Sequence, residues 1–153
     1  MKDEGGQEIR WGAAAMGWIV ASAAGVLLSP AIRFLYGLVV EPTVERGEFT
    51  STVVAISLVS GFLAYLLGGY VAGKVAGHSG GLNGAMTAVF GLAVGLVLAS
   101  VLALFGVLFS EGVTMPPAGF GFAGTALLAG LLLFLVNLLG GYVGGKLGEP
   151  PDA

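Results

Sequence analysis

Few side chains in this sequence could carry out chemistry, and their spacing does not bring them together. His78 is the only histidine, and the chain has no cysteine. A thiolate nucleophile, a disulfide and a cysteine metal site are therefore excluded. A lone imidazole without nearby carboxylates is also a poor basis for a metal site or a Ser–His–Asp triad. The glycine-rich stretch 68–84 lacks the G-x-x-x-x-G-K-[ST] pattern of a phosphate-binding loop. We therefore expect no catalytic residue, no metal and no cofactor, and predict that the protein is not an enzyme.

The composition indicates what kind of protein holds these few polar side chains. The chain has 153 residues, of which 56% are hydrophobic and only 10% are charged, and its mean hydropathy is +0.96. Because soluble domains are about 25% charged, these charges are too few to cover a surface that faces water. Disorder is excluded as well, since it requires low hydrophobicity. A net charge of −3 gives no footprint for nucleic acid. The composition indicates an integral membrane protein, whose first partner is the lipid bilayer.

Four apolar stretches are long enough to cross a hydrocarbon core of about 30 Å as helices. They cover approximately 12–29, 53–72, 84–109 and 123–143. None alternates polar and apolar residues as the strands of a membrane β-barrel do. Short polar turns separate the stretches at 41–48, 78–81 and 111–117. The sequence therefore predicts an all-α membrane protein with a single membrane domain, in which four transmembrane helices form two tandem helical hairpins.

The first span leaves two questions open. It can end near Pro30, in which case 31–40 lies along the outer membrane surface, or it can continue to Val40 as a long, tilted helix. It can also be read as a cleaved signal peptide, because Ala21-Ser22-Ala23 resembles a cleavage site. The acidic residues before it and the internal repeat described below favour a retained span.

Three polar residues within the spans are candidates for function, since such residues are rare inside a membrane. They are Asn137, Tyr65 and Arg33. Arg33 is expected to extend to the outer headgroups rather than bind a substrate. Asn137 lies near mid-membrane and is expected to hydrogen-bond a neighbouring helix, a contact worth about 0.6 kcal/mol; lining a polar pore is the alternative. No Asp or Glu lies within any span, which argues against a proton- or sodium-coupled carrier.

Two segments of the chain are nearly identical. Residues 62–74 and 134–146 differ at three positions, one of which pairs Tyr65 with Asn137. We interpret them as the ends of two repeat units, approximately 11–76 and 83–148. Because each unit holds two spans, both units have the same orientation, which predicts a parallel repeat about an axis along the membrane normal.

The 28 glycines often recur at four-residue spacing, the Gly-x-x-x-Gly pattern that lets membrane helices approach closely. The expected helix-packing positions are Gly69, Gly73, Gly77, Gly141, Gly145, Gly91, Gly95, Gly17 and Gly25. Their faces can serve the bundle itself or an oligomer interface. Packing within the bundle is the preferred interpretation, because some faces must hold the four helices together.

The basic residues predict the orientation. One side of the membrane is expected to hold Lys2, Arg10, Lys74, His78 and Lys146, and the other Arg46 and the Arg33 end of the first span. By the positive-inside rule, both termini then face the cytoplasm. The residues expected to anchor the inner interface are Lys74, Lys146, Tyr70, Tyr142 and Trp11.

The segment Gly-Gly-Tyr-Val-Ala-Gly-Lys at 68–74, its echo at 140–146 and the Gly-Gly-Leu-Asn-Gly-Ala at 80–85 carry a resemblance. Together they resemble small bacterial four-span integral membrane proteins of unknown function with a repeated Gly-Gly-Tyr-x-x-Gly-Lys helix end. The resemblance implies a four-span fold in a prokaryotic cell membrane and brings no catalytic residue. The stretch 137–141 is also similar to part of small fluoride channels. We reject that assignment, because the Thr/Phe/Ser-rich helix break is missing apart from a weak 49–52.

These observations predict a non-enzymatic multi-pass membrane protein that acts through helix–helix interaction. It would be an accessory or assembly subunit, or a self-associating bundle, and its partner would be a second copy or a larger membrane complex. The alternative is a channel or uncoupled carrier for a small or neutral solute.

Overall fold

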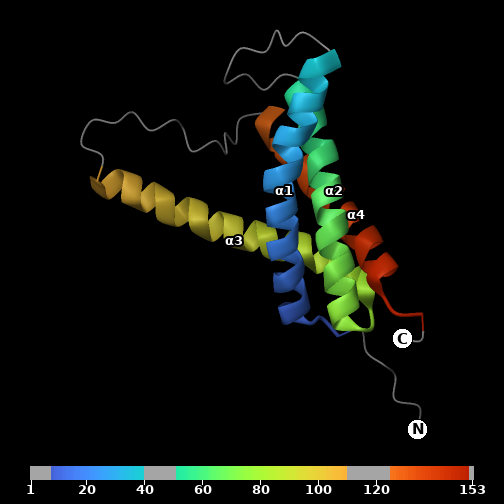
Figure 1. Cartoon of the computed structure of the whole chain (residues 1–153). Helices are drawn as coiled ribbons and strands as arrows, with labels where there is room; N and C mark the ends of the chain where they lie inside the picture. Colours follow the sequence, from blue (N-terminus) through green and yellow to red (C-terminus); the bar gives the residue numbers. More distant parts are fainter. Residues whose placement is uncertain (1–7, 40–50, 110–124, 152–153) are drawn as a thin grey trace.

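The computed structural model describes residues 8–39, 51–109 and 125–151, which fold into four helices (Figure 1). These are α1 (Trp11–Val39), α2 (Ser51–Ala76), α3 (Gly80–Phe109) and α4 (Thr125–Gly148). Each is long and apolar enough to cross a membrane, and the described residues contain no strand. The predicted all-α, four-span fold is confirmed. The turns expected at 41–48 and 111–117, as well as Lys2 and Arg46, lie outside the described residues.

The first span is one continuous helix. α1 passes through Pro30 without a break and is described as far as Val39, so the alternative in which the span ends near Pro30 does not hold. Membrane helices tolerate an internal proline, because neighbouring groups satisfy the backbone that it leaves unpaired. At 1.5 Å per residue, α1 is about 44 Å long, which exceeds a hydrocarbon core of about 30 Å. The helix must therefore tilt or extend beyond the core.

Helix α2 lies at the centre of the fold. It packs against the other three helices, whereas α1 and α4 do not contact each other within the described ranges. Glycines of α4 lie against backbone atoms of α2 in the pairs Gly140 with Phe62, Gly144 with Leu66, and Gly148 with Tyr70. Because the residue numbers rise together, α2 and α4 run parallel. The start of α1, the α2–α3 turn and the end of α4 therefore share one end of the bundle, which we call the terminal end (Figure 1).

Three helix backbones meet near the terminal end of α4. Gly141 lies against Gly69 of α2, and Gly145 lies against Gly73; these pairs occupy corresponding positions in the two similar segments. Two glycines of α3 take the other side, with Gly84 against Gly141 and Gly80 against Gly145. A Cβ atom at either position of α4 would collide with a backbone carbonyl of a neighbouring helix. Only glycine allows an approach this close.

The glycines of α1 pack in the same manner but over a shorter stretch. A Cβ on Gly17 would lie 2.7 Å from the carbonyl oxygen of Gly68 and 2.7 Å from the hydroxyl oxygen of Thr87. At Gly25 the helices are further apart, since a Cβ there would lie 3.8 Å from that of Ala64, an ordinary contact. The close approach of α1 is therefore confined to its first half.

Gly77 and Gly95 differ from the packing role that their spacing predicts. Among the residues that the structure describes, no atom of a neighbouring helix lies within 4 Å of where a Cβ on either would be. Gly77 follows the last residue of α2 and has a φ of 75°, the left-handed conformation with which glycine commonly ends a helix. Gly95 lies on the part of α3 that has left the bundle.

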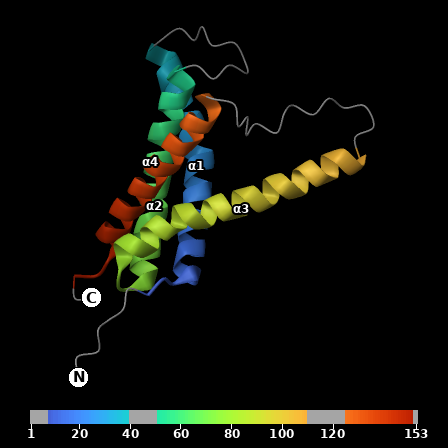
Figure 2. The ribbon, with the colours of Figure 1, turned by 180° about the vertical axis from the view of Figure 1, so that it is seen from behind.

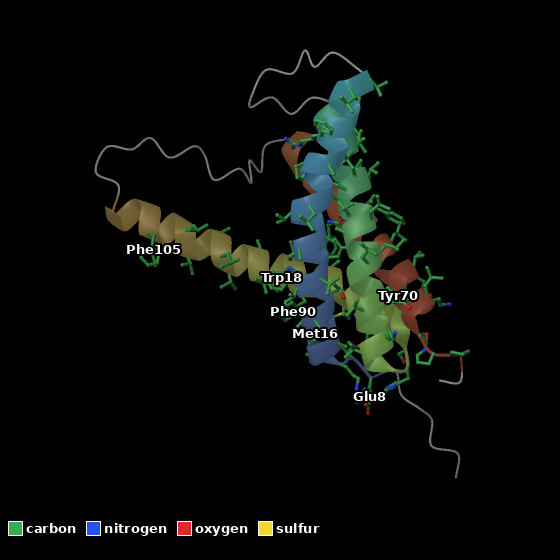
Figure 3. All side chains as sticks on the ribbon, viewed as in Figure 1. Glu8, Met16, Trp18, Tyr70, Phe90 and Phe105 are labelled. Carbon is green, nitrogen blue, oxygen red and sulfur yellow. The ribbon has the colours of Figure 1, made fainter. Side chains whose placement is uncertain are left out.

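Helix α3 departs from the other three helices after its first half. It extends away from them in both views (Figures 1 and 2). Its first turns are buried as far as Ala88, whereas most described side chains from Leu92 onwards are exposed. Just before this point, the ring of Phe90 meets that of Trp18 of α1 edge-on, with centroids 5.8 Å apart (Figure 3). These bulky rings lie where α3 turns away from the bundle. Nearer the terminal end, glycines keep the helices close together.

Candidate functional site: a pocket where α3 leaves the bundle

A pocket of about 410 Å³ lies between α2, α3 and α4. Its walls are mainly apolar and include Leu92 and Leu96 of α3 and Leu133 of α4. Two polar residues contribute to it, Tyr65 of α2 and Asn137 of α4. These are two of the three intramembrane candidates expected from the sequence, and they occupy corresponding positions in the two similar segments. The fold brings them into one pocket.

The side chain of Asn137 lacks the hydrogen bond expected for it. Its Oδ1 is shielded from solvent and has no hydrogen-bond partner among the described residues. This oxygen packs against Gly61 of α2, where any Cβ would collide with it. The amide nitrogen, Nδ2, is then the polar atom that can face the pocket. An unsatisfied amide oxygen in a membrane interior is costly, so this residue is not simply joining two helices.

Gly91 of α3 is the point on which polar atoms of two further helices converge. A Cβ on Gly91 would lie 2.6 Å from the hydroxyl oxygen of Tyr65 and 3.0 Å from Nε1 of Trp18. The two polar atoms therefore both reach the same small region beside the α3 backbone. Gly91 itself lines the pocket together with Tyr65 of α2 and Asn137 of α4, so the Trp18 N–H of α1 lies directly beside the pocket wall. Trp18 was not a site candidate from the sequence, where a lone tryptophan in an apolar span carries no signal for function.

Arg33, the third candidate, lies elsewhere. It is an exposed residue of α1 and is not among the residues that form the pocket. At 1.5 Å per residue it lies about 33 Å along the helix from Trp11. That distance matches the thickness of a hydrocarbon core and supports an arginine that extends to the headgroups far from the terminal end.

The terminal end contains a polar network around Asn83. This side chain is completely buried and joins the residues before α1 to the α2–α3 turn. Its Oδ1 accepts a hydrogen bond from the backbone N–H of Arg10 at 2.7 Å. Its Nδ2 lies within donating distance of the carbonyl oxygens of Glu8 (3.2 Å), Ser79 (3.1 Å) and His78 (3.4 Å). The network closes the terminal end of the bundle over the buried side of α3.

Arg10 makes a second link at this end. Its guanidinium donates to the carbonyl oxygen of Ala76, the last residue of α2, at 2.9 Å. A cation at this position donates a hydrogen bond to a carbonyl that is free at the helix end, and the negative end of the helix dipole stabilises its charge. Asn83 was not among the candidate residues expected from the sequence. The available signal was an amide within a stretch of glycine and apolar residues, directly before the start predicted for the third span.

The expected interface anchors lie at or near the terminal end. Trp11, Tyr70, Tyr142, Lys74 and Lys146 are all exposed. The ammonium group of Lys146 lies 5.6 Å from the ring centroid of Tyr142, within reach of a cation–π interaction. This distribution is the one expected at a membrane–water interface.

Metal ligation has no support in the described part of the chain, where no three His, Asp or Glu side chains are grouped closely enough to hold an ion. Comparisons with protein-family models, with curated proteins and with solved structures give no match. The fold and its hydropathy define a multi-pass membrane protein of four helices, and the pocket beside Gly91 is its candidate functional site.

Proposed function

We propose that the protein is non-enzymatic and acts through helix–helix interaction, with the outer half of α3 as the interacting element and a second copy of the chain as the partner. The observation that supports this proposal is the departure of α3 from the bundle. The described apolar side chains between Leu92 and Leu104 are mostly exposed, because this part of α3 extends away from the other helices (Figure 1). By contrast, the glycine faces near the terminal end are already occupied by contacts within the chain.

One face of α3 suits contact with a second copy. Val97, Val101 and Leu104 follow each other at helical spacing and point away from the pocket residues Leu92 and Leu96. All three are more than two-fifths exposed. A single apolar face can pack against the same face of another copy across a two-fold axis along the membrane normal. Such a contact forms a closed dimer that needs no second interface.

Cysteine crosslinking tests this interface cleanly, because the chain has no cysteine of its own. Val101→Cys is expected to form a disulfide-linked dimer in membranes on mild oxidation, since a two-fold contact brings the two Cα atoms to within about 7 Å. Leu96→Cys, on the opposite face of the same helix, serves as the matched control and should remain largely monomeric. Equal yields from the two variants, or no dimer from either, would refute the interface.

The orientation with both termini in the cytoplasm of a prokaryotic cell is also a proposal. It is supported by the basic side chains at or near the terminal end, namely Arg10, Lys74 and Lys146. In intact cells, Ser79→Cys should be protected from a membrane-impermeant thiol reagent, whereas Val39→Cys at the other end of the bundle should react. Permeabilised cells should label both variants. Labelling of Ser79→Cys alone in intact cells would reverse the assignment.

A second candidate function is binding or uncoupled passage of a small neutral molecule. The observation in its favour is the pocket in which Tyr65 and Asn137 come together. It does not compete with the first proposal, because the pocket and the face of Val97 and Val101 lie on opposite sides of α3.

A further inference from the structure

The pocket beside Gly91 has polar groups that the chain itself does not satisfy. Among the described residues, no hydrogen bond is formed by the Tyr65 hydroxyl, the Trp18 indole N–H or the Asn137 amide. Other polar side chains within the spans behave differently. Ser100, for example, donates to the carbonyl oxygen of Leu96 in its own helix at 2.8 Å. Two unpaired polar groups, from Tyr65 and Asn137, thus line the pocket, and that of Trp18 lies beside its wall at Gly91, where water is scarce and an unpaired donor is costly.

The unpaired polar groups indicate which kind of ligand the pocket would bind. Tyr65, Trp18 and the Nδ2 group of Asn137 all carry N–H or O–H donors. Among the described residues that line the pocket there is no Asp, Glu, Lys, Arg or His, so none of them would stabilise a charged ligand. A neutral molecule that presents a hydrogen-bond acceptor, such as a carbonyl oxygen, fits these donors.

The route of access indicates that the ligand is soluble in the membrane. Towards the terminal end the pocket is closed, because Ala88 is buried and Thr87 and Asn83 beneath it are completely buried. The opposite side is open where α3 leaves α4, with Leu96 half exposed and open space beside Gly130. This opening lies between two apolar helices and therefore faces lipid rather than the water at the terminal end.

We propose that the pocket binds a neutral, membrane-soluble molecule with a carbonyl acceptor, which enters laterally between α3 and α4. The apolar part of the molecule packs against Leu92, Leu96 and Leu133, and its carbonyl accepts hydrogen bonds from Asn137 and Tyr65. A volume of about 410 Å³ lies within the range of sites for small ligands. This inference rests on the second candidate function and names the class of ligand.

Quenching of Trp18 fluorescence tests the proposal, with a decyl-substituted benzoquinone as the probe. The full-length Trp11→Phe variant, reconstituted in phosphatidylcholine nanodiscs, leaves Trp18 as the only tryptophan. Addition of the quinone should quench its emission along a saturable curve. Asn137→Leu and Tyr65→Phe should each weaken the apparent affinity several-fold, up to about tenfold, because each removes one hydrogen bond. Ser100→Ala, which removes a hydroxyl bonded within its own helix, should leave the curve unchanged.

Two outcomes separate failure of this inference from failure of the second candidate function. Quenching that rises linearly with quinone and is the same in all variants reflects partition into lipid alone and would overturn the proposed ligand. Acrylamide, a small neutral quencher that is soluble in water, then tests the broader candidate in the same samples. Acrylamide quenching that depends on Asn137 would retain a site for small solutes while rejecting the membrane-soluble ligand. An unchanged thermal transition in each variant excludes loss of fold as the cause.

Discussion

Alanine in place of Gly145 is expected to lower the thermal transition of the purified protein by on the order of 10 °C. The added methyl group would collide with the backbone of α3 at Gly80, and the helix would also have to shift against Gly73 of α2. Neither neighbour is a flexible side chain that could move aside. Overpacking in a core costs about 1–3 kcal/mol, and a position clamped between two backbones belongs at the upper end of this range.

Gly130→Ala provides the matched control, because it makes the same chemical change in the same helix. In the described part of the chain, no atom of another element lies within 4 Å of the new methyl group. Alanine also favours a helix over glycine by up to about 1 kcal/mol, so this variant should be as stable as the original chain or slightly more so. The measurement is a thermal or SDS-titrated unfolding curve in detergent. Equal transitions for Gly145→Ala and Gly130→Ala would contradict the close packing of α4 against α2 and α3.

Gly145 and Gly130 also show what the sequence could and could not predict. Hydropathy alone predicted four membrane helices, because the thickness of the bilayer sets the approximate number of apolar residues needed to cross it. The four-residue spacing predicted that Gly69, Gly73 and Gly145 lie at helix contacts, where the structure places them. The same spacing pointed equally to Gly95, which lies in open space. Helices that are apolar all round have no periodicity to show which side meets a neighbour.

For the same reason, the sequence did not predict that α3 leaves the bundle. Its second half is at least as apolar as its first, and both halves are apolar enough for a membrane, so hydropathy does not show that the side chains become exposed near Leu92. The change depends on rings that come from elsewhere in the chain, namely Trp18 and Tyr65, which meet α3 beside Gly91. The candidate site was therefore predictable in part. Tyr65 and Asn137 stood out as polar residues within spans, but their meeting in one pocket depends on how the helices cross.

Asn83 was missed because its importance lies in backbone partners that are distant in the sequence. Replacing Asn83 by leucine, which is of similar size, should destabilise the fold by about 2–4 kcal/mol, since it leaves several backbone groups without their partner. The affected groups are the N–H of Arg10 and the carbonyl oxygens of Glu8 and Ser79. Water at the membrane surface can compensate some of them, which keeps the expected loss below the sum of the separate bonds.

Hydrogen exchange distinguishes this network from a general loss of stability. In Asn83→Leu, amides at the start of α1 and in the 77–83 turn should exchange much faster. Amides around Gly69 and Gly141 should exchange faster only by the amount that the loss of global stability explains. Arg10→Ala is the control within the same network. It removes the guanidinium bond to Ala76 but retains the backbone bond to Asn83, so it should cost about 1 kcal/mol. If the start of α1 exchanges alike in both variants, the buried amide does not hold it, and the other contacts of α1, such as those of Gly17 and Trp18, join it to the bundle.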